Sequence, residues 1–126
     1  MPALNRVQLI GRLGRDPEVR FTSTGREVTN FSLAVDHRWR GNDGELKEAT
    51  DWFQIVAWGR LGEICSQYLG KGRLVYLEGR LQTQRYEQQG ETRYFTRVIT
   101  QSIQFLDSEI PAQEEEAPEE PGDDVD

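Results

Sequence analysis

Apolar and polar residues alternate along most of this chain, and this alternation constrains its fold more than any other feature. In residues 6–13 every second position is apolar or glycine: Val7, Leu9, Gly11 and Leu13. A period of two is typical of a β-strand with one buried face. Residues 28–38 alternate in the same way, and residues 50–58 are rich in aromatic and β-branched side chains. The sequence therefore predicts three strands before residue 59.

One segment has the spacing of a helix instead. A single apolar stripe with helical period contains Leu61, Ile64, Cys65, Tyr68 and Leu69. Gly70 stands where a helix would end. Because Cys65 lies in this stripe, we interpret it as a packed thiol and not as a nucleophile.

Two further strands are predicted after this helix, in residues 73–84 and 93–105, joined by a hairpin around residues 88–91. The order is three strands, one helix and two strands. An all-β, five-stranded Greek-key barrel with one helix between its third and fourth strands is the OB-fold. The sequence predicts this fold.

The charge is divided unevenly along the chain. The net charge is −7, yet all 15 basic residues precede Ile110, where they are matched by 14 acidic residues. Residues 111–126 contain eight acidic residues, three prolines and no basic residue. Such a segment cannot bury enough apolar surface to offset the entropy of ordering it. We therefore predict one domain in residues 1–110 and a disordered acidic tail in residues 111–126.

The sequence offers little that would support catalysis. His37 is the only histidine and lies at a strand end, so we interpret it as a polar surface residue. A lone Cys65 excludes an intramolecular disulfide and a cysteine metal cluster. No phosphate-binding loop motif occurs. We expect no enzymatic activity, no cofactor and no metal. Without a signal peptide or an apolar run long enough to cross a membrane, we expect a cytoplasmic protein.

Two tryptophans share one strand. Trp52 and Trp58 are six residues apart, so both project from the same face. The opposite face carries the more apolar set: Phe53, Ile55 and Ala57. We therefore expect both indole rings to be open to solvent.

Two other aromatic residues have arginine neighbours, as Arg38-Trp39-Arg40 and Arg85-Tyr86 show. One interpretation is that these rings cover the barrel ends or a subunit interface. The other is that they stack on unpaired bases while the arginines hold phosphates. The abundance of arginine also has a simpler explanation, a genome rich in G and C.

Several stretches resemble the bacterial single-stranded DNA-binding proteins, over about residues 4–106. The similar stretches occur in order along the domain: NRVQLIGRLGRDPEVRFTSTG, VTNFSLAV, TDWFQIVAWGRLGEICSQYLGKG and VYLEGRL. The resemblance implies an OB-fold and a homotetramer around which single-stranded DNA wraps. It also implies that bases stack on Trp39, Trp52, Trp58 and Tyr86. Some members have phenylalanine at the position of Trp58 and tryptophan at that of Tyr86.

Basic residues near the DNA path are implied in the same way at Arg6, Arg20, Arg60, Lys71 and Arg85. Together with Arg38 and Arg40, these are the candidate phosphate ligands. Family tails usually end in a short hydrophobic tip that docks onto replication and repair proteins. This chain stops at Val125-Asp126, which lacks an aromatic tip. Either the tail is shortened or partners are recruited differently.

The predicted function is sequence-tolerant binding and protection of single-stranded DNA in replication, recombination and repair, at the nucleoid. An OB-fold RNA-binding protein is the alternative, and it would need contacts to 2′-hydroxyl groups. A structural subunit with tryptophan interface anchors is a third possibility.

Overall fold

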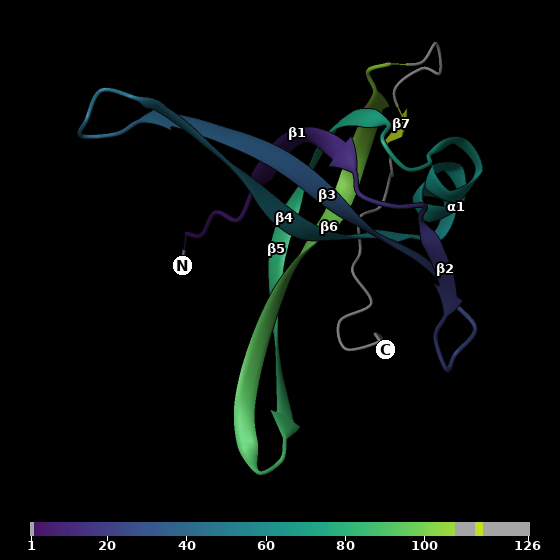
Figure 1. Ribbon diagram of the computed structural model, residues 1–126. Helices are drawn as coiled ribbons and strands as arrows, with labels where there is room; N and C mark the ends of the chain where they lie inside the picture. The colour runs from purple at the N-terminus through teal and green to yellow at the C-terminus, as the bar shows by residue number, and fades with distance from the viewer. Residues whose placement is uncertain (1, 108–112, 115–126) are drawn as a thin grey trace.

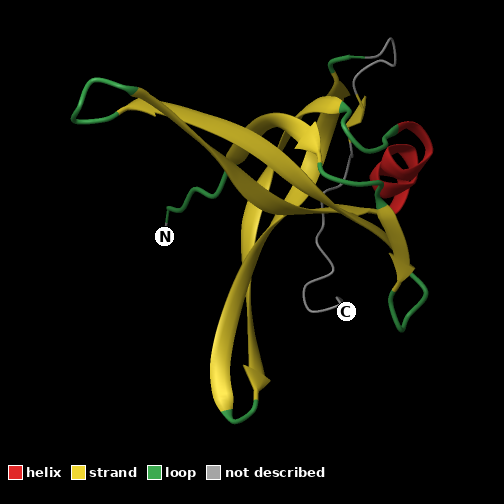
Figure 2. Ribbon diagram, viewed as in Figure 1, coloured by secondary structure: helices red, strands yellow, loops and turns green. Residues whose placement is uncertain are grey.

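The computed structural model describes residues 2–107 and 113–114, which form one sheet with a single helix (Figures 1 and 2). The elements in chain order are β1 (Val7–Leu13), β2 (Glu18–Phe21), β3 (Glu27–Arg40), β4 (Leu46–Trp58), α1 (Gly59–Tyr68), β5 (Leu74–Gln88), β6 (Glu91–Phe105) and β7 (Gln113–Glu114).

Five of the strands close into a barrel. Their order is β1-β5-β6-β4-β3, and a short antiparallel pairing of β3 with β1, at Leu13 and Leu33, completes the circle. The β4–β6 pairing is parallel and short, with Val56 beside Ile99. The predicted five-stranded OB-fold, with its helix between the third and fourth barrel strands, is confirmed.

β2 is the one strand of the described chain before β7 that the sequence did not predict. It lies outside the barrel, along the edge of β3, where Glu18 pairs with Asn30. All four of its residues are exposed. Val19 and Phe21 do alternate with Glu18 and Arg20, but this pattern covers only four residues and does not correspond to a buried face.

The barrel is filled by the alternating side chains of its strands. Phe31, Leu33, Ile55, Leu77 and Ile103 belong to one continuous buried cluster. α1 packs against β3 and β4 and adds Leu61, Ile64 and Cys65 to this cluster. Tyr68, predicted to lie in the buried stripe, is 46% exposed. The helix ends at Tyr68, and Leu69 caps it, one residue before the predicted Gly70.

Two hairpins extend well beyond the barrel, in different directions (Figure 1). β3 and β4 stay paired out to Arg40 and Leu46, and β5 and β6 stay paired out to Gln88 and Glu91. These strands are longer than predicted. Their outer residues are exposed on both faces, so hydrogen bonding of the backbone continues where hydrophobic alternation has ended.

Most of the predicted acidic tail lies outside the described residues. Within it, Gln113–Glu114 form the two-residue strand β7 against Ser102 and Ile103, a pairing that the prediction of a disordered tail did not include. No helix among the described residues is long and apolar enough to cross a membrane.

Candidate nucleic-acid interface

Three of the four predicted stacking rings are open to solvent. The exposed fractions are 42% for Trp39, 59% for Trp52 and 40% for Tyr86. Trp58 is only 8% exposed. The expectation that Trp58 offers an open ring is therefore wrong for the isolated chain.

The burial of Trp58 comes from a second small cluster on the outer face of the barrel. Trp58 lies there with Val28, Val56 and Ile99. The Arg26 guanidinium covers its ring at 5.0 Å from the centroid, within the range of a cation–π contact. Trp58 does share a face with Trp52, as predicted. However, the parallel β4–β6 pairing brings Ile99 onto that face beside Val56, which no local pattern could reveal.

Trp52 lies on the outer face of the β3–β4 hairpin, where the hairpin leaves the barrel. A methyl group built on Gly14 would come within 2.5 Å of the Trp52 ring, so this glycine makes room for the indole. Ala34, its partner on β3, is small as well. The ring thus lies against Gly14, the residue that follows β1, and more than half of the Trp52 surface remains exposed.

Trp39 lies farther out on the same hairpin and faces the other way. Trp39 pairs with Lys47, and Ala34 pairs with Trp52, so the two tryptophans project from opposite faces. His37 stacks on Trp39, with ring centroids 5.1 Å apart and planes inclined by 19°. This neighbour covers part of the indole, and His37 is itself exposed, as predicted for a polar surface residue.

Tyr86 has an aromatic partner that was not predicted from the sequence. Phe95 on β6 meets it edge to face, with centroids 5.8 Å apart, and is itself 43% exposed. The two rings form an aromatic pair near the end of the β5–β6 hairpin. The alternation in residues 93–97 places Phe95 on the same face as Arg93 and Arg97. An aromatic ring between two arginines was the signal from which Phe95 could have been predicted as a site residue.

The predicted phosphate ligands are spread over the exposed surface, and most are paired with acidic neighbours. The ion pairs are Arg6–Glu78 at 2.7 Å, Arg20–Glu18 at 3.3 Å, Arg38–Glu48 at 3.0 Å, Arg60–Glu63 at 2.6 Å and Arg85–Glu87 at 3.5 Å. Arg40 donates instead to the Gly44 carbonyl, and Lys71 is exposed. Exposed ion pairs contribute only about 0–1 kcal/mol each. These guanidinium groups can therefore exchange a carboxylate for a phosphate at little cost.

Arg6 differs from the others because it belongs to a polar network on the outer face of β1 and β5. Gln8 donates to Tyr76 and Glu78, and the Tyr76 hydroxyl donates to Glu78. The Tyr76 and Gln8 hydrogen bonds, with the charge of Arg6, hold the pKa of Glu78 below its usual value. The hydrogen bond to Glu78 raises the pKa of Tyr76. The network is satisfied within the chain, so Arg6 is less free to bind phosphate than the hairpin arginines.

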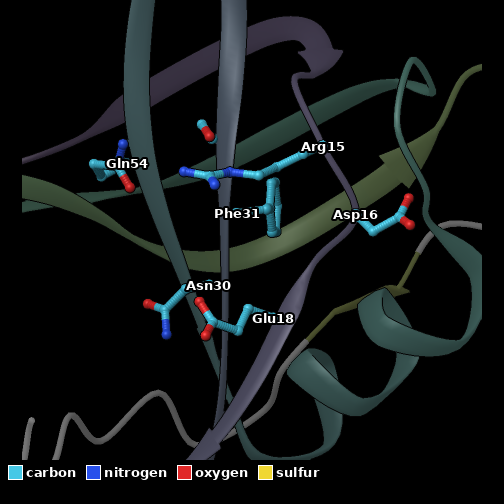
Figure 3. A pocket seen from close by; sticks show the side chains of 7 residues that line it. Arg15, Asp16, Glu18, Asn30, Phe31 and Gln54 are labelled. Carbon is cyan, nitrogen blue, oxygen red and sulfur yellow. The ribbon is translucent and has the colours of Figure 1, made fainter.

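Two adjoining hollows share Arg15, Ser32 and Gln54, and one of them is also lined by Trp52. The other extends to Asp16, Glu18 and Asn30, and Figure 3 shows its side chains. Together they form the hollow beside Trp52. None of Arg15, Asn30, Ser32 and Gln54 was predicted from the sequence as a site residue. The described residues include no group of three or more histidine, cysteine or acidic side chains that could hold a metal ion.

Open aromatic rings beside exposed arginines, on hairpins that extend from an OB-fold barrel, are features of proteins that bind single strands. The sequence model of the Single-strand binding protein family matches residues 4–106. The chain belongs to this family. Its predicted membership is confirmed.

Individual relatives agree with this assignment. The chain is 50% identical over 105 residues to Single-stranded DNA-binding protein 1 of Chlorobaculum tepidum, and the match covers 82% of this chain and 65% of that protein. The chain thus spans just under two thirds of this relative's length.

Two solved structures have the same fold. One is the Plasmodium falciparum SSB in complex with single-stranded DNA, with a TM-score of 0.78, 34% identity, and coverage of 84% of this chain and 97% of that one. The other is a deletion mutant of the single-stranded DNA-binding protein from Thermus aquaticus. It has a TM-score of 0.75 and 30% identity, and covers 87% of this chain and 54% of that one.

Proposed function

We propose that this protein binds single-stranded DNA with little sequence preference and protects exposed strands during replication, recombination and repair. The observation that carries the proposal is the exposure of Trp39, Trp52 and Tyr86 on a family fold, with arginines beside them. The related structure of an SSB complex with single-stranded DNA supports the choice of ligand.

Binding by this surface combines two terms. Each unpaired base that stacks on an open ring contributes about 1–3 kcal/mol, whatever the base, because every base has a π-face. Arginines such as Arg38 and Arg85 neutralise phosphates and release condensed counterions. A duplex hides its base faces, so it can use only the second term. The protein therefore discriminates strands by their pairing and not by their sequence.

No catalytic step is part of this proposal. The DNA-bound protein would lie in the cytoplasm, at the nucleoid. Contacts with replication or repair proteins through the acidic tail fall mostly outside the described residues, so they stay a prediction from the sequence.

We also propose that the chain assembles into a homotetramer. The outer face of β1 leaves Ile10 54% exposed, opposite Tyr76 on β5 and next to the network of Arg6, Gln8 and Glu78. Ile10 is thus an exposed apolar side chain among ordered polar groups on the outer face of β1. This arrangement supports a contact with a second copy of the chain. Molar mass from light scattering tests this proposal. A mass of one chain across micromolar concentrations contradicts it.

The test of the main proposal is a titration of tryptophan fluorescence with oligo-dT at several salt concentrations. We expect quenching that saturates, and log K falling by about 0.7 per phosphate contact for each tenfold rise in salt. Matched duplex should bind far more weakly. Fluorescence that does not respond to oligo-dT would contradict base stacking, and a preference for matched RNA in competition would favour the RNA-binding alternative.

A further inference from the structure

The hollow beside Trp52 has the composition of a site for the edge of a base. It follows the outer face of the β3–β4 hairpin, where Ser32 pairs with Gln54 and the neighbouring pair places Ala34 opposite Trp52. A base stacked on Trp52 would direct its edge along this face. The first side chains that the edge could meet are Ser32 and Gln54.

The polar groups of the hollow are available for a ligand. The side chains of Asn30, Ser32 and Gln54 make no hydrogen bond to any residue that the structure describes. Arg15 likewise forms no ion pair within residues 2–107, unlike five of the predicted phosphate ligands. In Figure 3 its side chain extends across β3 toward Gln54.

The opposite end of the hollow disfavours phosphate. Glu18 lies there, directly across from Asn30, and Asp16 lines the same hollow. Asp16 accepts a hydrogen bond from the Lys71 backbone, which holds its carboxylate in place, and Glu18 forms an exposed ion pair with Arg20. The Asp16 carboxylate repels a phosphate, whereas the uncharged edge of a base is not repelled. Arg15, at the Trp52 end, remains as the phosphate contact.

We propose that this hollow is a base-edge subsite, in which Gln54 hydrogen-bonds the base stacked on Trp52 and Arg15 binds the adjoining phosphate. The proposal deepens the proposed function and rests on it. An amide offers one donor group and one acceptor group, and a half-turn of its plane exchanges them. Gln54 can therefore pair with cytosine, which presents an amino donor and a ring acceptor, and in the flipped orientation with thymine, which presents the reverse. The subsite adds affinity without adding sequence preference.

The experiment replaces this amide with an apolar group of similar size that neither donates nor accepts. Gln54→Leu should lose the hydrogen bond to the stacked base, whether that base is cytosine or thymine. At pH 8, where cytosine is neutral, it should bind both oligo-dC and oligo-dT about fivefold more weakly than the wild type does, the effect of one net hydrogen bond. The affinity ratio of the two oligomers should stay unchanged, because the amide serves either base.

Gln67→Leu is the matched control, because Gln67 is an exposed glutamine on α1 and the side-chain change is the same. It should bind both oligomers as tightly as the wild type does. A second strand, of equal length but abasic, should bind Gln54→Leu and wild type alike, whereas Arg15→Gln should weaken binding of the abasic strand too.

The subsite is overturned if Gln54→Leu binds oligo-dC and oligo-dT as tightly as Gln67→Leu does, or if Gln54→Leu weakens binding of the abasic strand. In both cases the wild type still binds oligo-dT, so single-strand binding itself stands. Failure of the wild type to bind oligo-dT would instead remove the proposed function and the subsite with it.

Discussion

Trp52 and Trp58 project from the same side of β4, but they differ in exposure to solvent. Trp52 rests over Gly14 with 59% of the residue exposed, whereas Trp58 is 8% exposed under the Arg26 guanidinium. An open ring can receive a base, and a buried ring stabilises the barrel. Substitution separates these contributions because binding and folding are measured independently.

Trp52→Ala should weaken oligo-dT binding about tenfold or more, the loss of one stacked base, with little change in melting temperature. Trp58→Ala should instead destabilise the fold by about 3–5 kcal/mol, because it leaves a cavity among Val28, Val56 and Ile99. Fluorescence titration and thermal unfolding measure the two effects. Equal losses of stability in both variants would show that the difference in burial has no energetic consequence.

Cys65 should be chemically inert in the folded protein. It is fully buried, and this burial raises the pKa of its thiol to about 12. Because the thiolate is the reactive form, a disulfide-exchange reagent at pH 8 should label Cys65 only as fast as the chain unfolds. The Cys65→Ser variant, which has no thiol, gives the background signal. Rapid labelling of the native protein above this background would contradict the expectation.

At the scale of elements, the β5–β6 hairpin carries its aromatic pair on its outer part, where both rings are partly exposed. Phe95 meets Tyr86 edge to face. Such pairs contribute about 0.5–1.5 kcal/mol beyond the area that they bury. We interpret Phe95 as a positioning residue that fixes the orientation of Tyr86.

Phe95→Leu should therefore weaken oligo-dT binding about threefold while the melting temperature changes little, since Phe95 is 43% exposed. In the Tyr86→Ala background the same change should have no further effect. A double-mutant cycle measures this coupling, and strictly additive losses would show that the two rings act separately.

The end of β6 is fastened to the start of β5 by one carboxylate. Asp107 accepts hydrogen bonds from the Leu74 backbone and, at 3.0 Å, from Arg73. These contacts hold the pKa of Asp107 below its usual value. A depressed carboxyl pKa stabilises the fold above the unfolded-state pKa of about 3.9, and this stabilisation is lost as the pH falls through the folded-state value.

Asp107→Asn should consequently lower the melting temperature at pH 6 to 7, and the difference from the wild type should shrink as the pH falls below about 4. Melting curves across this range test the sign. A difference that stays constant with pH would show that the charge of Asp107 is not the stabilising feature.

At the scale of the whole molecule, charge is separated between the body and the tail. The body is nearly neutral, with 15 basic and 14 acidic residues up to Ile110, and residues 111–126 add eight acidic residues. Most arginines in the body already have carboxylate neighbours, so the proposed binding of DNA requires an exchange of these partners. We expect a polyanionic segment on the same chain to compete for the same arginines.

Deletion after Ile110 should tighten oligo-dT binding at low salt, and the gain should fade as salt screens the competition. Titrations of the full and the deleted chain at two ionic strengths give the comparison. Equal affinities at low salt would remove the proposed competition.

Local sequence determined the barrel strands, the helix and the distribution of charge. Alternation in residues 6–13 and the stripe from Leu61 to Leu69 each report one element's buried face, so both could be read from neighbouring residues. The open rings of Trp39 and Tyr86 followed from their arginine neighbours. The exposed strand β2 and the outer hairpins could not be predicted in the same way, because backbone pairing there does not depend on a buried face.

Only the tertiary structure decided which surfaces stay open. Trp58 is buried because a parallel pairing brings Ile99 against its face, and the hollow beside Trp52 exists because the chain folds Arg15 and Glu18 back over β3. Both depend on segments that are distant in sequence and adjacent only in the closed barrel. Periodicity reports which face a side chain is on, but burial also depends on what the rest of the chain places over that face.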